Sequence, residues 1–467
     1  MVNPSRPPGA DIHRIARLMD EDLLAQGLPG DSRAEARFIL IAVLAGALAG
    51  LVGALFHGLI NILMVWPQWL GGVVQGWPLV GAAALVTLLC TILSVFVVRR
   101  FAPEAGGSGV QEIEGAMEGL RVVRWRRVLP VKFFAGVTAI SSGLVLGREG
   151  PTIHIGASIA AAIAERFRVN ELERRGLLAA GAAAGLACAF NAPVAAVLFI
   201  VEETHREFPY TFRTYLGVAV AAIASTVVTQ LMLGDGPDLP LLVVSAPLSW
   251  LPGFLLLGAV LGVVGMLLNA AILRAVAFSA RSHQRVPYLY PAAVGLVTGA
   301  LLILLPNTVT GGEGVILSLA TAHPALGLLL LLALIRFVTT VACYSSGVPG
   351  GIFAPMLTLA VCIGLAFGEA ARVLLPDAGI APLAFAIAAM GGLFTASVRA
   401  PIVGVALTLE LTGSYALVLP LMVTCVTADL VAQWVGGRPI YSQLLERTLA
   451  QAGVTRPASA SEPTGLA

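Results

Sequence analysis

An arginine and a glutamate stand side by side in an otherwise apolar stretch, GLVLGREGPTIHIG at residues 143–156. Arg148 and Glu149 lie between glycines, and Pro151 follows two residues after the glutamate. Because proline in the first turn of a helix costs no hydrogen bond, this pattern predicts a helix that begins near Glu149. A buried Arg148–Glu149 ion pair is one interpretation, although adjacent residues of a helix point in different directions. The other is that Glu149 takes part in function, since an ionisable group in so apolar a setting is costly.

Glycine-rich breaks precede three segments that can form helices. They read GGSGV at residues 106–110, GREGP at 147–151 and GGIFAP at 350–355. The free N–H groups at the start of a helix and the helix dipole both favour an anion, and glycine lets the backbone approach that anion. Three such starts that converge would hold an anion by partial charges, without trapping it. The alternative is that these glycines serve only the close packing of helices.

A carboxylate at the start of such a helix could itself occupy the anion site. Glu149 would compete with the anion while charged and leave the site once protonated, which would couple proton binding to anion access. A second acidic pair, Glu202 and Glu203, ends the apolar run VLFIVEE. One of these two can be a charge at the cytoplasmic end of a helix, and the other could pass protons between water and the interior.

These residues belong to a chain with the composition of a membrane protein. It has 467 residues, of which 58% are hydrophobic and 12% charged, whereas soluble domains have roughly a quarter charged residues. The formal net charge of +2 gives no indication of a nucleic-acid partner. The five cysteines lack metal-ligand spacing, which predicts buried thiols and no metal site: Cys90, Cys188, Cys343, Cys362 and Cys425. The chain is therefore predicted to be an all-α polytopic membrane protein.

Long apolar runs alternate with interrupted ones along the chain. The runs at 38–60 and 79–98 reach the about 20 residues that cross the hydrocarbon core. Ten further segments follow, several of them too short to span or broken by Gly and Pro: 131–147, 151–164, 176–201, 214–233, 250–278, 288–305, 324–343, 352–376, 381–396 and 401–434. Broken helices are tolerated at membrane depth only where protein or a water-filled cavity covers the freed backbone. Such helices are typical of transporters and channels.

The sequence contains an internal repeat. NAPVAAVLFIVE at 191–202 and RAPIVGVALTLE at 399–410 lie 208 residues apart. The prolines that end GREGP and GGIFAP lie 204 residues apart. Two similar halves, at roughly 38–233 and 250–450, are therefore predicted, with a site at their interface near the membrane midplane.

The distribution of charge predicts the topology. The loop at 233–242 holds two aspartates and no basic residue, whereas arginines gather in the N-terminal arm and in four later clusters, at 121–127, 166–175, 274–285 and 438–447. The positive-inside rule then places both termini in the cytoplasm, and the expected membrane is the cell inner membrane. The arm at 1–37 lacks the apolar core of a signal peptide, and its residues 11–25 have the spacing of an amphipathic helix. Residues 451–467 are predicted to be a disordered tail.

Five stretches, in order, resemble those of the CLC family of chloride channels and proton-coupled chloride antiporters: GSGVQEIEGA, GREGP, FNAPVAAVLFIVEE, GGIFAP and RPIYS. The resemblance covers roughly residues 38–449. It implies a CLC-type transmembrane domain at 38–450, with two inverted-topology halves and broken and re-entrant helices. It also implies a homodimer in which each subunit has its own anion pathway, with chloride, protons and the lipid bilayer as partners. No cofactor is expected, and no nucleotide, because the chain ends too soon for the nucleotide-binding domains of larger members.

The resemblance also assigns the anion contacts. Ser108 and Tyr441 look like the residues whose hydroxyls contact the central anion from two sides. Ile352 and Phe353 look like the residues whose backbone N–H groups donate to it. Serine at position 108 favours chloride, because members with proline there resemble nitrate exchangers. One position departs from the family pattern, since Gln111 stands where the family usually has proline, and the geometry of this helix start is expected to differ slightly.

The proton-handling residues are assigned in the same way. Glu149 looks like the gating glutamate of the family, within a gate region that comprises Gly147, Arg148, Gly150 and Pro151. Glu203 looks like the internal glutamate that transfers protons, and members that are plain channels usually lack an acid there. The resemblance therefore implies a proton-coupled chloride antiporter and not an enzyme.

Other interpretations remain open at the level of sequence. A passive voltage- or pH-gated chloride channel of the same fold would need every site except Glu203. An intramembrane serine protease is a distant alternative, based on the short GGSG pattern around Ser108 and on His154 as a base. Lys132, the only lysine, either raises the local potential for anions or snorkels to the membrane surface.

Overall fold

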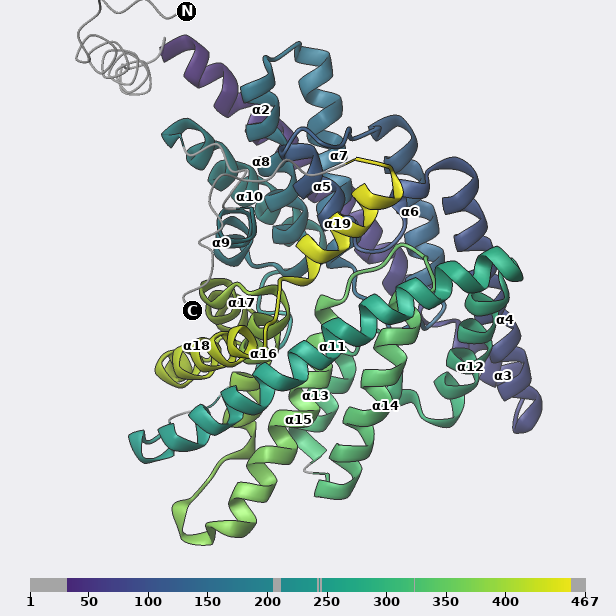
Figure 1. Cartoon of the computed structure of the whole chain (residues 1–467), viewed down its shortest axis with the longest axis vertical. Coiled ribbons are helices and arrows are strands. Elements are labelled where there is room, and N and C mark those ends of the chain that lie inside the picture. The colour runs from purple at the N-terminus through teal and green to yellow at the C-terminus, as the bar shows by residue number, and fades with distance from the viewer. Residues whose placement is uncertain (1–31, 205–210, 242, 244–245, 323, 455–467) are drawn as a thin grey trace, which may run out of the picture.

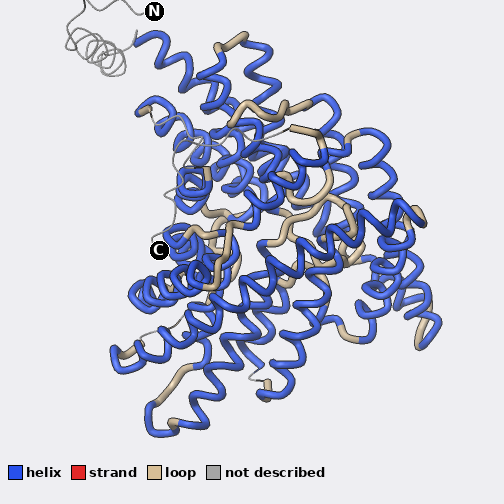
Figure 2. The backbone as a smooth tube through the Cα atoms, viewed as in Figure 1, coloured by secondary structure: helices blue, strands red, loops and turns tan. Residues whose placement is uncertain are grey.

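The computed structural model describes residues 32–204, 211–241, 243, 246–322 and 324–454, and every regular element in this part of the chain is a helix (Figure 2). The first of these helices begins at Ser32, inside the stretch predicted as an arm. The predicted amphipathic helix at 11–25 lies outside the described residues, as does the tail from residue 455 onward.

The described helices fall into two sets along the chain (Figure 1). The first half comprises α2 Ser32–Leu63, α3 Trp66–Val73, α4 Trp77–Phe101, α5 Val110–Met117, α6 Trp125–Ser141, α7 Glu149–Phe167, α8 Glu171–Phe190, α9 Pro193–Glu203 and α10 Phe212–Leu233. The second half comprises α11 Leu251–Arg285, α12 Leu289–Leu304, α13 Glu313–Ala322, α14 Leu326–Tyr344, α15 Phe353–Leu374, α16 Pro382–Val398, α17 Pro401–Thr412, α18 Val418–Trp434 and α19 Ile440–Gln451. Short 3₁₀ turns lie at Pro103–Ala105, Leu248–Trp250, Pro306–Thr308, Pro376–Ala378 and Tyr415–Leu417.

Two of the predicted apolar runs each form two helices. The run at 176–201 divides into α8 and α9, because Asn191 adopts a left-handed conformation (φ 51°) and Pro193 then starts a new helix. The run at 401–434 divides into α17 and α18, and Gly413, directly after α17, is left-handed (φ 70°). Helices α3, α5, α13 and α19 fall outside the predicted runs. They have 8, 8, 10 and 12 residues, so none reaches the length on which the prediction relied.

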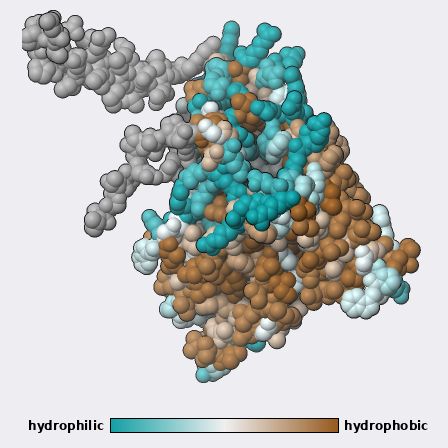
Figure 3. Space-filling model, turned by 45° about the vertical axis from the view of Figure 1, so that its right-hand side comes forward, coloured by the Kyte–Doolittle hydropathy of each residue, from teal (hydrophilic) through white to brown (hydrophobic). Residues whose placement is uncertain are grey.

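Seven stretches of the described helices are long and apolar enough to cross a membrane: Arg33–Val73, Trp77–Phe101, Phe212–Leu233, Leu248–Arg285, Leu326–Tyr344, Phe353–Leu374 and Tyr415–Trp434. On α4, Leu85, Leu89 and Leu93 stand one turn apart and are 54%, 56% and 52% exposed, which suits lipid and not water. Figure 3 shows hydrophilic residues gathered toward one end of the molecule and hydrophobic residues over the rest of this face. The chain is a multi-pass membrane protein.

The two halves use equivalent helices in equivalent ways. Helix α8 packs against α7 and α10, and α16 packs against α15 and α18, while α9 meets α17 across the boundary between the halves. Glu202 in α9 accepts hydrogen bonds from the start of α17, 3.3 Å from the backbone nitrogen of Ile402 and 2.9 Å from that of Val403. Glu410 in α17 accepts two equivalent bonds from the start of α9, 3.1 and 2.6 Å long. The predicted repeat is therefore a repeat in structure, and reciprocal caps join its halves.

Candidate functional site

Backbone hydrogen bonds bring the three glycine-rich breaks together. Gly107 donates to the carbonyl of Val348 at 2.9 Å and accepts from Gly350 at 3.1 Å. Gly147 and Gly351 exchange two bonds, 2.8 and 2.7 Å long. These bonds form two isolated bridges between the first and second halves of the chain, one between Gly107 and Pro349 and one between Gly147 and Gly351. The convergence expected from the sequence is thus present, and it lies at the interface of the repeats.

Four helices begin around these breaks, namely α5, α7, α15 and α19. Their N-cap residues are Gly109, Arg148, Ile352 and Pro439, and none of these makes a side-chain capping hydrogen bond. The first N–H groups of a helix have no partner within the helix, and together with the dipole they carry partial positive charge. Uncapped starts therefore leave donors available for an anion.

Buried oxygen atoms without hydrogen-bond partners gather at these starts. Ser108 and Tyr441 are fully buried, and neither hydroxyl makes a hydrogen bond within the described residues, although the tyrosine hydroxyl lies near the serine side chain. Leaving a buried polar group unsatisfied costs about 1–3 kcal/mol, so each such group calls for an explanation. Two hydroxyls that can both donate to one acceptor are suited to contact a small anion.

Phe353 packs the start of α15 into the same place. Its ring centroid is 5.9 Å from that of Tyr441, 5.0 Å from that of Phe394 and 5.5 Å from that of Phe199. Ile352 and Phe353 are both buried, at 0% and 1% exposure. The aromatic cluster fixes the position of their backbone N–H groups relative to the tyrosine ring.

The carboxylate of Glu149 lies among these helix starts. It is fully buried, and neither oxygen has a hydrogen-bond partner of normal geometry within the described chain. The backbone nearest to it belongs to Glu149 itself, at the start of α7, and to Ala354, at the start of α15. The side chain folds back against Gly147 and Gly351, because a Cβ atom added to either glycine would meet the carboxylate. The carboxyl group thus lies where two helix dipoles favour a negative charge.

Arg148 points away from its neighbour in the sequence. Its guanidinium pairs with Asp238 at 3.0 Å and with Glu313 at 3.1 Å, and also donates to the carbonyl of Ala189 and contacts the His57 ring. The interpretation of a buried Arg148–Glu149 ion pair is therefore wrong. None of these contacts was predicted from the sequence, because no local pattern links the partner residues to Arg148.

Gly150 and Pro151 complete the predicted gate region in the first turn of α7. A Cβ atom on Gly150 would come within 2.8 Å of the Cα atom of Ser108, so only glycine allows these two backbones to approach. Pro151 is buried and lies within the helix without disturbing it, as expected of a first-turn proline. The GREGP and GGSG breaks thus meet directly at residues 108 and 150.

The two glutamates at the end of α9 have different settings. Glu202 caps α17, so it is a contact between the halves and not merely a charge at a helix end. Glu203 is half-buried and lies within electrostatic range of the Tyr441 hydroxyl. The two glutamates therefore differ in their contacts, and proton transfer by Glu203 stays a prediction.

Lys132 supports the first glycine-rich break. It is completely buried, and its ammonium group donates to the carbonyls of Ala105 at 3.0 Å and Gly107 at 2.7 Å. The snorkelling interpretation is wrong, since the side chain does not reach the surface. Its Nζ atom binds the residue directly before Ser108, and the alternative that Lys132 raises the local potential for anions stays a prediction.

The geometry required of a serine protease is missing. A nucleophilic serine and its base are expected within hydrogen-bond reach of each other. Here Ser108 Oγ and His154 Nδ1 are both buried without any hydrogen-bond partner in the described structure. His154 instead fills the space beside Gly109, which is left-handed at φ 93°. Its role is to shape the break.

The fold and the site together define a class of membrane protein, in which two inverted halves bring uncapped helix starts, two hydroxyls and a carboxylate to one buried place. A sequence model of the family described as "Voltage gated chloride channel" matches residues 90–433. The chain therefore belongs to this family, the CLC family that its motifs resemble.

Individual relatives match over nearly the whole chain. The H(+)/Cl(-) exchange transporter ClcA of Vibrio cholerae serotype O1 is 45% identical over 438 residues, which cover 92% of this chain and 93% of that protein. The transporter of the same name from Salmonella paratyphi C is 43% identical over 470 residues, 97% and 98% of the two chains. Among solved structures, a slow cyanobacterial Cl-/H+ antiporter matches with a TM-score of 0.86 at 34% identity, covering 89% of this chain and 99% of that one.

Proposed function

We propose that this chain exchanges chloride for protons across the membrane, moving the two ions in opposite directions. The observation that carries the proposal is the position of the Glu149 carboxylate, between the starts of α7 and α15 and within electrostatic range of the unpartnered, buried Tyr441 hydroxyl. Relatives that match over more than nine-tenths of the chain are named as H(+)/Cl(-) exchange transporters, which supports it.

Chloride binds at a site formed by four hydrogen-bond donors. The hydroxyls of Ser108 and Tyr441 donate from the side chains, and the backbone N–H groups of Ile352 and Phe353 donate from the start of α15. Every one of these donors carries only a partial charge, so the site compensates the lost hydration of chloride without a full cation. An anion held in this way can leave again, which transport requires.

Glu149 couples this site to protons. While ionised, its carboxylate occupies the place beside Gly147 and Gly351, next to the site formed by the four donors, and excludes chloride from that place. A proton taken from water neutralises the carboxylate, the helix dipoles no longer favour it there, and chloride replaces it. Glu149 thus alternates between a protonated state and an ionised state that excludes chloride. Because of this alternation, chloride and protons do not move independently of each other. Gly147, Arg148, Gly150 and Pro151 hold this part of the chain in place.

Glu203 supplies protons from the other side. It lies near the Tyr441 hydroxyl at the end of α9 and is half-buried, so it can exchange protons with water and face the interior. A passive channel would not need an acid at this position. The presence of Glu203 therefore favours exchange over passive conduction.

The proposal includes the setting of the protein. The transmembrane domain at 38–450 lies in the inner membrane with both termini in the cytoplasm, and two chains form a homodimer. Apolar side chains spaced one turn apart on α10 and α18 support a further helix-packing surface: Ile223, Val227, Leu231, Met422, Val426 and Leu430 are each at least 43% exposed. The chain acts as a secondary transporter and not as an enzyme, in keeping with the names of its relatives.

Liposomes that contain the purified protein test this function. They are loaded with potassium chloride, diluted into weakly buffered solution of low chloride, and made permeable to potassium with valinomycin, while chloride and pH electrodes record the outside. Exchange predicts that external pH rises as chloride leaves and that a protonophore abolishes the rise. Chloride efflux without a pH change, matched against protein-free liposomes, would instead identify a passive channel.

A further inference from the structure

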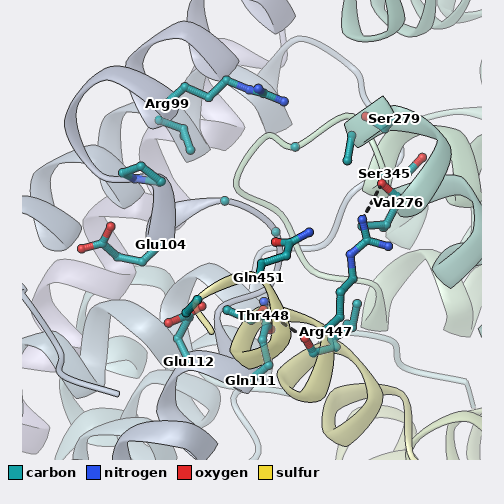
Figure 4. A pocket seen from close by; sticks show the side chains of 18 of the residues that line it. Arg99, Glu104, Gln111, Glu112, Val276, Ser279, Ser345, Arg447, Thr448 and Gln451 are labelled. Atoms are coloured by element: carbon teal, nitrogen blue, oxygen red, sulfur yellow. Dashed lines mark hydrogen bonds between the residues drawn. The ribbon is translucent and has the colours of Figure 1, made fainter. Parts of the chain in front are cut away.

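A cavity of about 610 Å³ reaches the first glycine-rich break (Figure 4). Its walls come from the ends of α4, α5, α11, α14 and α19, and include Gly106 and Gly107, the two residues directly before Ser108. An anion that travels between water and Ser108 through this cavity passes whatever side chains stand beside Gly107. Gln111, the residue that departs from the family pattern, is one of them.

Gln111 has an unusual environment for an amide side chain. It is the second residue of α5 and is only 8% exposed, yet its Oε1 atom has no hydrogen-bond partner within the described residues. Its Nε2 atom lies beside Gly107, as does the Tyr344 hydroxyl, since a Cβ atom on that glycine would be 3.8 Å from the first and 3.6 Å from the second. The amide and the phenol thus flank the peptide that leads to Ser108.

Some of the charged side chains at or near the cavity are bound to other groups of the protein. Arg121 pairs with Glu112 at 2.8 Å, and Arg447 donates to the carbonyls of Leu273 and Val276. Lys132 is bound to the carbonyl of Gly107. Gln111 adds a neutral amide to this wall of the cavity, and the two N–H groups of its Nε2 atom are the donors that stand beside Gly107.

We propose that Gln111 is a specificity-determining residue of the anion pathway, whose side-chain N–H groups donate to the anion as it passes between the cavity and Ser108. This rests on the proposed function. An amide replaces part of the water shell that a small anion loses, and it does so more effectively for chloride than for a large, weakly hydrated anion such as thiocyanate. Gln111 therefore favours chloride at the inner approach to the site.

Two substitutions remove the donor while preserving the helix. Gln111→Leu keeps the approximate size of the side chain, and Gln111→Pro introduces the residue usual in the family. Proline is tolerated in the first turn of α5 because the backbone N–H at that position makes no helical bond. Gln451→Leu is the matched control, since Gln451 lines the same cavity but is exposed at the end of α19 (Figure 4).

Calorimetry on the purified full-length protein measures the dissociation constants for chloride and thiocyanate separately. Loss of one hydrogen bond predicts that chloride binds about three- to tenfold more weakly in both Gln111 variants, with a smaller change for thiocyanate. Gln451→Leu should match the unmodified protein within about twofold. Gln111→Glu, which places a negative charge on a side chain of similar size, should weaken chloride binding more than either neutral substitution.

Unchanged chloride affinity in both Gln111→Leu and Gln111→Pro would overturn the proposal, as would an equal loss in Gln451→Leu. A chromatographic profile identical to that of the unmodified protein shows that a variant is folded. Because calorimetry reads binding and not transport, this result is independent of the liposome assay. If the unmodified protein moved chloride without protons, the exchange function would fail while the assignment of Gln111 could still stand.

Discussion

The carboxylate of Glu149 lies against the backbone of Gly351, a residue of the opposite half of the chain. A Cβ atom on Gly351 would be 3.1 Å from Oε2 of Glu149 and 2.9 Å from the backbone nitrogen of Gly150. The two bonds between Gly147 and Gly351 hold these segments together. The predicted gate region therefore contains residues of both halves, and the observed position of the Glu149 carboxylate requires that residue 351 have no side chain.

Gly351→Ala should disturb the gate directly. The added methyl meets backbone on one side and the Glu149 carboxylate on the other, and we expect a loss of about 1–3 kcal/mol in the free energy of unfolding. Gly314→Ala is the matched control, because a Cβ atom there meets nothing within 4 Å and alanine favours the helix. Thermal unfolding in detergent compares the two, and equal melting temperatures would show that the close approach at Gly351 has been misjudged.

Glu202 and Glu410 should be equally important to stability. Each caps the helix start in the opposite half with two hydrogen bonds. Replacing either by glutamine removes the charge that strengthens both bonds and should cost about 1–2 kcal/mol. Asp377→Asn, at an exposed loop position, serves as the control. A large effect from only one of the two glutamates would contradict the symmetry of the caps.

Glu203→Gln should separate proton movement from stability. The neutral amide cannot carry a proton, so liposomes with this variant should release chloride without the rise in external pH. The melting temperature should remain close to that of the unmodified protein, in contrast to Glu202→Gln. If proton uptake persisted in Glu203→Gln, the internal proton donor would have to be another residue.

Ser108→Ala and Tyr441→Phe should change affinity and stability in opposite directions. Each removes one hydroxyl that has no partner in the described protein, so in chloride-free buffer the variant should be as stable as the original or more stable. Chloride binding should weaken by about three- to tenfold, because one donor to the anion is lost. Calorimetry and thermal unfolding measure the two effects. A loss of stability with unchanged chloride affinity would indicate a structural role for these hydroxyls.

Much of the site could be read from the sequence because its parts are local motifs. Each glycine-rich break predicts the start of a helix. The offset of 208 residues between the repeated stretches predicts two similar halves that meet at an interface. That the helix starts converge on one place is a result of the packing and is seen only in the structure. The matched positions of Glu202 and Glu410 are visible in the sequence, but their reciprocal capping was not predicted from it.

Other features depend on tertiary contacts that no local pattern encodes. The partners of Arg148 come from a loop after α10 and from the start of α13, far along the chain. Lys132 and Ala105 are brought together only by the packing of α6 beneath the break. Helices α3, α13 and α19 were missed because length and periodicity, which identify spans, give little signal over 8 to 12 residues.

The most direct test of the central claim is whether an anion takes the place of the Glu149 carboxylate. Crystals of the unmodified protein and of Glu149→Gln, both grown in bromide, would be compared by anomalous scattering. The claim predicts a bromide near Ser108 and Tyr441 in both, and a further bromide at the start of α15, beside Gly351, only in Glu149→Gln. The same bromide positions in both proteins would contradict competition between the carboxylate and the anion.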